Sequence, residues 1–596
     1  MHRKDGNRYR NAHARKAAPG THTARRALAG LMALPLLVLP LLTLPLLTGC
    51  GAGNGHGPDG TPGVSAETAT EAVAASTRRD PVTFTLFIGE TNSNADGFQS
   101  PVAKRITELT GVTLDIEYLA SGDEKQRMAL MVASGKYPDL VFAKGNLQTL
   151  KDAGAILRLD DRIEKSIHIK GFYGDNFKRL RYSTADPGIY CLGGKEVGGE
   201  PAEPTTGFLL QHRVVEALGY PRLKTLDDYE QAIRTYLAAH PETDGKPTVG
   251  LSLLADDWRA MISLTNPACF ATGGPDDGEW YIDPDTDAII RHLTRPEERA
   301  YFRWLNRMNA EGLLDPESFV QQYDQYLDKI ATGRVLALAD ARWNITDAQT
   351  RLRQAGMDDR MYGHYPLTLT GDVDYREFQS TGYIGGWGIS ITTACRDPQR
   401  AFDFLDWFHS EEAQILTHWG IEGVHWDTVD GRRAMRPEVV AQQASDPYFP
   451  KKTGISLYTY PFPSYGNTVL DSSGQRYEAF VTPEAIQARQ TETENRVLAA
   501  YGAKMWKDLY PAADTWPAKT WGAAWTIKME DQRIQAMDAT IVDIGIRMIP
   551  QAVLAPPEAF DARWDAYLAA IRDAGLDQVA ERMQEALKER IALWNE

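Results

Sequence analysis

Aromatic rings stand beside charged or amide side chains at several points of the sequence. The chain of 596 residues contains 14 Trp and 25 Tyr. An aromatic face can cover the apolar C–H face of a small solute, while neighbouring polar groups pair with the hydroxyl groups at its edge. All of these polar groups must be hydrogen-bonded once water is expelled. Sugars present such faces and edges. The candidate binding residues are Glu90, Asn92, Asn94, Trp258, Arg342, Trp343, Tyr383, Trp387, Glu422, His425 and Trp426.

Predicted strand ends favour some of these candidates. In open α/β sheets, ligands lie beyond the carboxyl ends of the strands. Residues 82–88 alternate apolar and β-branched side chains, and residues 335–339 form a short apolar run, so both are predicted strands. The alternative for the candidates after the first strand is a solvated turn. The candidates that follow these strands are Glu90, Asn92 and Asn94 after the first, and Arg342 and Trp343 after the second.

The remaining candidates each have a structural alternative. Tyr383 and Trp387 flank two glycines ahead of a predicted strand, and glycine permits close approach of the backbone, so we expect Trp387 in a cleft rather than in the core. Trp258 follows Asp256 and Asp257, a pattern that suits a sugar but equally well starts a helix. Packing of a tight loop is the alternative for Glu422, His425 and Trp426.

Motifs of other chemistries are missing from the sequence. It contains no HExxH, no GxSxG, no phosphate-binding glycine loop and no Cys/His pair at a recognisable spacing. We therefore expect no catalytic residues. Because an acidic chain always offers two carboxylates that a glycosidase could use, a secreted carbohydrate-active enzyme stays the main alternative. A receptor for peptides or other polar solutes, or a protein that reports to a membrane receptor, is another.

Metal and disulfide signals are weak. Asp283, Asp285 and Asp287 have the spacing that opens an EF-hand loop, but Ala288 stands where Gly is needed and Thr294 where Glu is needed. We predict a turn between two short strands there and no cofactor, with a structural calcium ion elsewhere left open. One disulfide and buried free thiols are equally compatible with the cysteines after residue 50, which are Cys191, Cys269 and Cys395.

The order of predicted elements indicates an α/β fold. Between residues 82 and 142, three strand patterns alternate with two helix patterns, which implies a mostly parallel sheet covered by helices. Residues 200–330 turn helical, with a predicted helix at 226–239 capped by Thr225. Strand patterns return at 335–339 and 387–391, and helices dominate from residue 399 onward.

The N-terminal residues have the features of an export signal. A basic stretch precedes the apolar run Ala27–Leu47, which three prolines make unsuitable as a straight membrane helix. The run ends in Leu47-Thr48-Gly49-Cys50, which resembles the bacterial lipobox, whose cysteine becomes the lipid-modified N-terminus. Residues 1–49 are the predicted signal peptide, and the Gly- and Ala-rich residues 50–80 a flexible tether.

The charge of the chain argues against two kinds of partner. The chain has 64 Lys and Arg against 80 Asp and Glu, a net charge of −16. Eight of those basic residues and one acidic residue precede Cys50, so the remainder is more negative still. A field of this sign repels nucleic acid and anionic lipid.

Motifs spread along the body resemble one family. Gly135–Leu140 is similar to the G-x-Y-P-D motif of extracellular sugar-binding proteins. The order of the other motifs resembles extracellular solute-binding protein family 1, in its large LplA-like lipoprotein subgroup. These motifs are the stretches Ala401–Phe408, Ser410–Ala413, Gly420–Trp426 and Phe560–Asp577.

The resemblance implies a bilobal, periplasmic-binding-protein-like α/β fold whose hinge is crossed several times by the chain. It implies one lobe from residues 81–205 and 335–395, and another from 206–334 and 396–596. It also implies a monomeric, lipid-anchored receptor outside the cytoplasm. Such a receptor holds a small solute, expected to be an oligosaccharide, in the cleft and delivers it to the permease subunits of an ABC transporter.

Overall fold

The computed structural model describes residues 80–119, 124–194, 201–275, 278–381, 387–466, 469–527 and 529–595. All of them belong to one compact unit, residues 69–596. The predicted signal peptide, the lipidation of Cys50, the ligand contact by Tyr383 and all but residue 80 of the predicted tether lie outside the described residues. Every helix within the described ranges is too short or too polar to cross a membrane.

The first sheet has four strands in the order β12-β3-β1-β2. The three N-terminal strands run parallel, and β12 is antiparallel to β3. Helix α2 starts where the Ser100 hydroxyl accepts from the Ala103 amide, and it ends at Gly111, whose φ of 68° suits glycine. The predicted β–α–β–α–β order is confirmed. The elements are β1 (Val82–Ile88), α2 (Pro101–Thr110), β2 (Val112–Tyr118), α3 (Glu124–Ser134), β3 (Leu140–Phe142) and β12 (Ile389–Ile391).

The second sheet has the order β11-β4-β10-β7. Strand β10 pairs parallel with β7 and antiparallel with β4, so both of its edges are hydrogen-bonded and all seven of its residues are buried. This burial explains the continuous apolar run seen in the sequence. The strands are β4 (Thr206–Gln211), β7 (Val249–Ser252), β10 (Val335–Ala341) and β11 (Tyr362–Tyr365).

The strand pairing corrects the predicted division of the chain. Residues 335–395 were assigned to the first lobe, but β10 and β11 pair within the second sheet, and only β12 returns to the first. The sequence predicts residues 396–596 in the second lobe, yet Phe404, Phe408 and Phe462 pack in the hydrophobic core of the first sheet. Local patterns predict strands, whereas the partner that satisfies each strand edge is set by distant segments.

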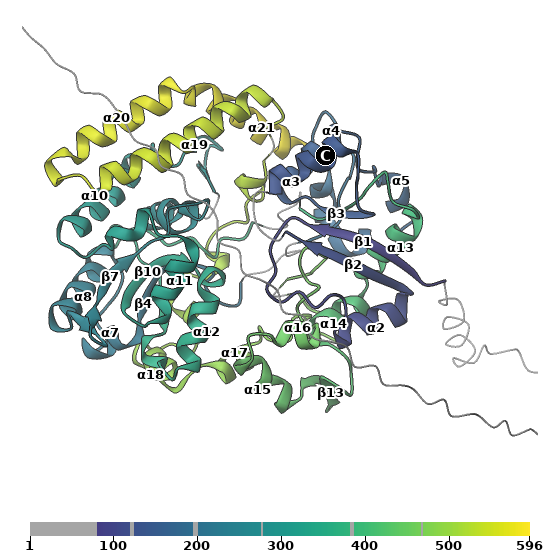
Figure 1. Cartoon of the computed structure of the whole chain (residues 1–596), viewed down its shortest axis with the longest axis horizontal. Coiled ribbons are helices and arrows are strands. Elements are labelled where there is room, and N and C mark those ends of the chain that lie inside the picture. Colours follow the sequence, from purple (N-terminus) through teal and green to yellow (C-terminus); the bar gives the residue numbers. More distant parts are fainter. Residues whose placement is uncertain are drawn as a thin grey trace, which may run out of the picture. The chain divides into compact units, whose positions relative to one another are not determined.

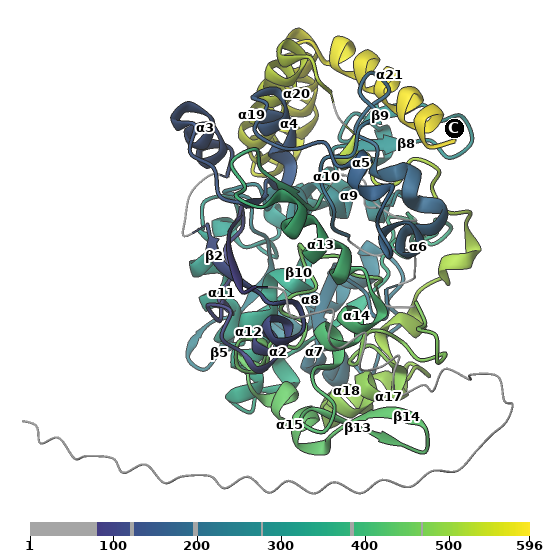
Figure 2. The ribbon, with the colours of Figure 1, turned by 90° about the vertical axis from the view of Figure 1, so that its right-hand side faces the viewer.

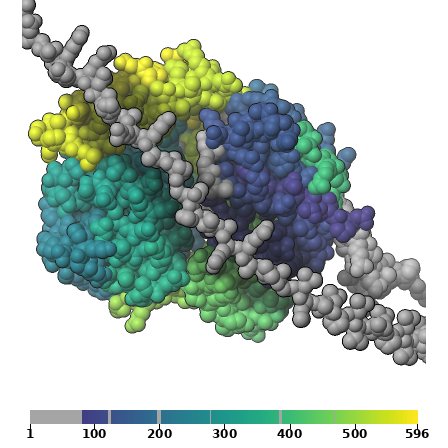
Figure 3. Space-filling model, in the orientation of Figure 1, coloured from purple at the N-terminus to yellow at the C-terminus, as the bar shows by residue number. Residues whose placement is uncertain are grey.

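Helices of the first core come from two parts of the chain. Figures 1 and 2 both show α13 on the side of the first sheet, near α5, and Figure 3 shows green surface of this later segment beside blue N-terminal surface. Its buried side chains join those of β1 and β3 in one cluster. The helices are α4 (Leu147–Asp152), α5 (Asp160–Ile163), α6 (Ile169–Tyr173), α13 (Pro398–Phe408), α14 (Glu411–Trp419), α15 (Pro437–Ser445) and α16 (Phe449–Thr453).

Helices of the second core include the C-terminal ones. Trp564 stacks on Phe302 with ring centroids 4.8 Å apart, which fixes α20 against α10. The predicted cap Thr225 forms a complete capping box with Asp228. The helices are α7 (His212–Ala217), α8 (Leu226–Ala239), α9 (Asn266–Ala271), α10 (Pro296–Ala310), α11 (Tyr323–Ala331), α12 (Thr346–Gln354), α18 (Glu492–Ala500), α19 (Gln532–Val553), α20 (Phe560–Asp573) and α21 (Leu576–Asn595).

Besides short 3-10 and π segments, the described residues also form one further α-helix and three short hairpins. The turn predicted at Asp283–Asp287 joins two paired strands, where Asp283 accepts from the amides of Asp285 and Thr286 and from the Thr286 hydroxyl. That prediction is confirmed. The elements are α17 (Pro483–Arg489), β5 (Glu242–Thr243) with β6 (Lys246–Pro247), β8 (Trp280–Ile282) with β9 (Ile289–Arg291), and β13 (Trp426–Val429) with β14 (Arg432–Met435).

Candidate ligand-binding site

Loops from both sheets meet at a group of aromatic rings around one lysine. The Lys144 ammonium lies 5.5 Å from the centroid of Trp258 and 5.7 Å from that of Trp387. Trp343 stacks on Trp258, and Trp525 contacts Trp387 with centroids 4.7 Å apart. We call Lys144 and these four rings the tryptophan cluster. Lys144 follows β3, Trp258 follows β7 and Trp343 follows β10, so the cluster lies beyond the carboxyl ends of strands from both sheets.

Trp258 and Trp343 form an open platform. Their ring centroids are 6.1 Å apart and their planes are 11° from parallel. The two residues are 51% and 53% exposed, among the most exposed large hydrophobic residues that the structure describes. Exposed indole surface of this kind is available to the apolar face of a ligand.

A buried polar network holds the platform in place. The Asn344 amide nitrogen donates to both carboxylate oxygens of Asp340, at 2.9 and 3.1 Å, and the Asn344 amide oxygen accepts from Arg259 Nε at 3.1 Å. The Arg259 guanidinium then lies 4.9 Å from the Trp258 ring centroid. Tyr326 donates to Asp340 at 2.6 Å. Burial raises the pKa of Asp340 to about 6, against the lowering effect of these hydrogen bonds.

The first-sheet side of the cluster is built differently. Lys144 Nζ lies 3.0 Å from Glu90 Oε1, and each side chain is 28% exposed. The Tyr460 hydroxyl donates to the same Glu90 oxygen at 3.1 Å. Lys144 has a φ of 48°, in the left-handed region that residues other than glycine rarely adopt. Glu90 was predicted from its position after β1. Sequence reasoning missed Lys144, although its position after the strand at 140–142 is the same signal.

A cavity of about 220 Å³ adjoins the cluster. Gln148 donates to the main-chain oxygen of Glu530 at 3.3 Å, and Gln535 donates to the Gln148 side chain at 3.1 Å. These bonds tie α4 of the first core to the start of α19 in the second. Nothing in the local sequence pattern indicated that Trp525, Thr526, Ile527, Met529 and Gln535 line this cavity. The lining residues are Lys144, Gly145, Gln148, Trp387, Trp525, Thr526, Ile527, Met529 and Gln535.

Three other predicted site residues bond within or beside their own loops. Arg342 forms an ion pair with Glu203, while its neighbour Trp343 faces Trp258. The Asn92 side chain accepts from the Asn94 amide at 2.8 Å. Asn92 and Asn94 therefore belong to one tight turn after β1.

Glu422, His425 and Trp426 have the contacts of a packed loop. His425 Nδ1 accepts from the Ile421 amide at 2.9 Å, and the Trp426 indole donates to the Gly420 carbonyl at 3.1 Å. Burial lowers the pKa of His425. Glu422 accepts from the Thr428 hydroxyl at 2.9 Å. No contact among the described residues joins these three side chains to the tryptophan cluster.

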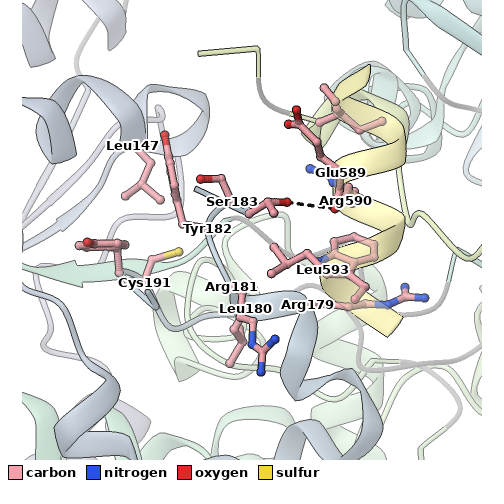
Figure 4. A pocket seen from close by; sticks show the side chains of 15 residues that line it. Leu147, Arg179, Leu180, Arg181, Tyr182, Ser183, Cys191, Glu589, Arg590 and Leu593 are labelled. Carbon is pink, nitrogen blue, oxygen red and sulfur yellow. Dashed lines mark hydrogen bonds between the residues drawn. The ribbon is translucent and has the colours of Figure 1, made fainter. Parts of the chain in front are cut away.

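A smaller cavity of about 50 Å³ lies between residues 179–191 and α21 (Figure 4). The Arg179 and Arg590 guanidinium groups lie 4.7 and 4.8 Å from the Trp594 ring centroid. Arg590 donates to the Thr526 hydroxyl at 2.7 Å, and burial lowers its pKa to about 9. Because both guanidinium groups also donate to main-chain oxygens, this region fits a packing contact better than a ligand site.

The three cysteines are buried free thiols. Cys269 belongs to a buried group in which its sulfur and ligand atoms of His292 and Glu298 lie within 4.8 Å of one another. Burial alone would raise the pKa of Glu298, but His292 and Arg295 hold it below its usual value. Glu298 also accepts from the Leu293 amide. Because the Glu298 carboxylate is already paired with His292 and Arg295, these three side chains fit a buried ion-pair network better than a metal site.

The chain belongs to a known family. Residues 102–424, more than half of the chain, match the sequence profile of the bacterial extracellular solute-binding proteins. This family consists of binding proteins rather than enzymes. The match confirms the predicted resemblance of this chain to extracellular solute-binding proteins.

Two Bacillus subtilis (strain 168) proteins are similar in sequence. Lipoprotein LipO is 22% identical over 358 residues, and the polygalacturonan/rhamnogalacturonan-binding protein YtcQ is 21% identical over 343 residues. Each match covers 56% of this chain and 65% of the relative, so the chain spans slightly less than two thirds of either relative's length.

Solved structures confirm the predicted fold class. Alginate-binding protein AlgQ2 aligns with a TM-score of 0.59 at 17% identity, over 86% of this chain and 99% of that chain. The Streptococcus pneumoniae ABC-transporter substrate-binding protein FusA, solved with kestose, aligns with a TM-score of 0.62 at 15% identity, over 86% of this chain and 100% of that chain. Both are mixed α/β solute-binding folds.

Proposed function

We propose that this protein captures an oligosaccharide at the tryptophan cluster and delivers it to an ABC importer. The observation that carries the proposal is the open Trp258–Trp343 platform, which lies opposite the Lys144–Glu90 pair. The platform offers two nearly parallel apolar faces, and the pair offers a hydrogen-bond donor and an acceptor. Consecutive sugar units present the matching combination of C–H faces and hydroxyl edges.

The names of similar proteins support a carbohydrate ligand. YtcQ is named for binding polygalacturonan and rhamnogalacturonan, and FusA was solved with kestose. These ligands differ in charge, so they support the class of ligand rather than one sugar.

The two hydrophobic cores are the proposed lobes. Buried residues at successive points of the chain alternate between the two cores: Leu192, Ile389 and Phe480 belong to the first core, and Phe208, Phe378 and Val497 to the second. Several passages of this kind form a hinge about which lobes can close on a ligand. The contacts of Lys144 with Trp258 and of Gln148 with Glu530 join the two sides near the cluster.

A titration separates binding from catalysis and from peptide capture. Purified protein would be titrated calorimetrically with kestose, trigalacturonate and a tripeptide, and the mixtures analysed for products. We expect one saccharide to bind at one site without turnover, and to stabilise the fold by about 2.7 kcal/mol at a concentration of 100 Kd. Product formation would identify an enzyme, and binding of the peptide alone would identify a different receptor.

We also propose that Cys50 carries the lipid that holds the protein at the outer face of the cell membrane. The lipobox-like sequence and the name of the relative LipO support this. Lipid anchoring through one modified cysteine needs no spanning helix. Metabolic labelling with an alkynyl palmitate should mark the wild type and not Cys50→Ser. Recovery of Cys50→Ser in the membrane fraction at the wild-type level would contradict the proposal.

A further inference from the structure

Three groups approach the ring of Trp258. Trp343 stacks nearly parallel to it at 6.1 Å, the Arg259 guanidinium lies 4.9 Å from its centroid, and the Lys144 ammonium lies 5.5 Å from it. Two of these groups are cations over the ring, so a ligand that stacks on the face under either cation must displace that cation.

Arg259 is firmly held. Its Nε donates to Asn344 at 3.1 Å and its Nη1 donates to Asp257 at 2.5 Å. Its guanidinium also stacks on Tyr323, 3.9 Å from the ring centroid. Moving Arg259 would break all of these contacts together, so this cation is part of the platform.

Lys144 is held less firmly than Arg259, and it belongs to the other sheet. It belongs to the loop after β3 in the first sheet, whereas Trp258 follows β7 in the second. Its ammonium shares an ion pair with Glu90 at 3.0 Å, at a position that is 28% exposed, where such pairs contribute little. Its flexible stem of four methylene groups lets the ammonium leave the Trp258 ring and stay near Glu90.

We propose that Lys144 is a displaceable cover of the Trp258 platform. A sugar that stacks on Trp258 pushes the ammonium off the ring, and the ammonium then donates to Glu90 and to oxygens of the sugar. The inference rests on the proposed function, because it describes how that same site admits its ligand. It also specifies the ligand class: neutral or acidic sugars are accepted, and amino sugars are disfavoured by the ammonium that stays beside them.

Association kinetics test the cover. A cation–π contact contributes about 1–2 kcal/mol when partly desolvated, so the face of the ring under Lys144 is free about a tenth of the time, and association at that face slows by about tenfold. Lys144→Met keeps the stem and removes the charge. We expect a kon for kestose or trigalacturonate about tenfold higher in Lys144→Met than in the wild type, measured by stopped-flow Trp fluorescence.

A matched control exists in the first core. The Lys151 ammonium lies 4.5 Å from the centroid of Tyr182, away from the cluster. Lys151→Met should leave kon unchanged. If Lys144 only contacts bound ligand, Lys144→Met would raise koff and leave kon unchanged, and this result would overturn the proposal.

Fluorine NMR tests the cover without a ligand. In protein labelled with 5-fluorotryptophan, the Trp258 signal is assigned from Trp258→Phe. We expect Lys144→Met to shift this signal and increase its solvent isotope effect, while Lys151→Met does neither. An unchanged Trp258 signal in Lys144→Met would contradict the proposal that Lys144 covers the ring. If the wild type binds neither kestose nor trigalacturonate, the proposed function is wrong for these two sugars. The Trp258 fluorine signal still decides whether Lys144 covers the ring.

Discussion

The two sides of the tryptophan cluster differ in how their functional groups are held. On the second-sheet side, Trp258 is backed by Arg259, which continues through Asn344 to the buried Asp340. On the first-sheet side, Lys144 is held by one partly exposed ion pair with Glu90. The second-sheet side is therefore a fixed surface, and the first-sheet side is adjustable. A binding site needs both properties, because it must select a ligand and also admit it.

The largest expected effect is on the fixed side. Asp340→Ala leaves the Tyr326 hydroxyl, the Asn344 amide and the Ala341 amide without their acceptor. Buried donors that lose their partner are costly, so we expect a loss of about 3–4 kcal/mol in the free energy of unfolding, measured by urea denaturation. Asp328→Ala, which removes an exposed partner of Arg351, should change it by less than about 0.5 kcal/mol. Equal stability of the two variants would show that the Asp340 network does not stabilise the fixed side.

The pH dependence of stability should reveal the same carboxyl group. Because burial raises the pKa of Asp340 from 3.8 to about 6, the folded state holds this proton more tightly than the unfolded state. The contribution of Asp340 is therefore fully present below pH of about 4 and is lost as the pH rises through about 6. Between these values, the wild type should lose up to about 3 kcal/mol relative to Asp340→Asn. Parallel stability curves would show that Asp340 ionises normally.

Binding should depend on the exposed platform. Trp258→Ala removes an aromatic face that is half exposed, so we expect the affinity for the best saccharide to fall by about 30-fold, or about 2 kcal/mol, with little loss of stability. Trp343→Ala should act in the same direction. Tyr448 is also 53% exposed and lies outside the cluster, so Tyr448→Ala is the matched control. Normal binding by both tryptophan variants would place the site elsewhere.

The smallest effect on stability is expected on the adjustable side. Glu90→Ala removes the ion pair with Lys144 and the acceptor of the Tyr460 hydroxyl. Because Glu90 and Lys144 are partly exposed, the free energy of unfolding should fall by less than about 1 kcal/mol in the same urea experiment. A loss as large as that of Asp340→Ala would show that both sides are rigid.

Sequence reasoning predicted some of the residues that the structure brings together in the tryptophan cluster. Glu90, Trp343 and Trp387 were predicted from their places next to strands, and Trp258 from its charged neighbours. All four lie in or beside the cluster. The same reasoning could not separate Arg342 from Trp343, which are adjacent in the chain but turn to different partners. It also missed Trp525, because residues 516–525 carry no pattern that ties them to a sheet edge.

The sequence by itself determined the local features of this protein. These include the alternation that forms β1 and β2, the cap Thr225, the turn at Asp283–Asp287 and the family motifs, all of which depend on neighbouring residues. Only the tertiary structure decided that β10 joins the second sheet, and that Lys144 from one sheet reaches Trp258 from the other. These facts depend on hydrogen-bond partners and packing surfaces distant in the chain, which no local period encodes.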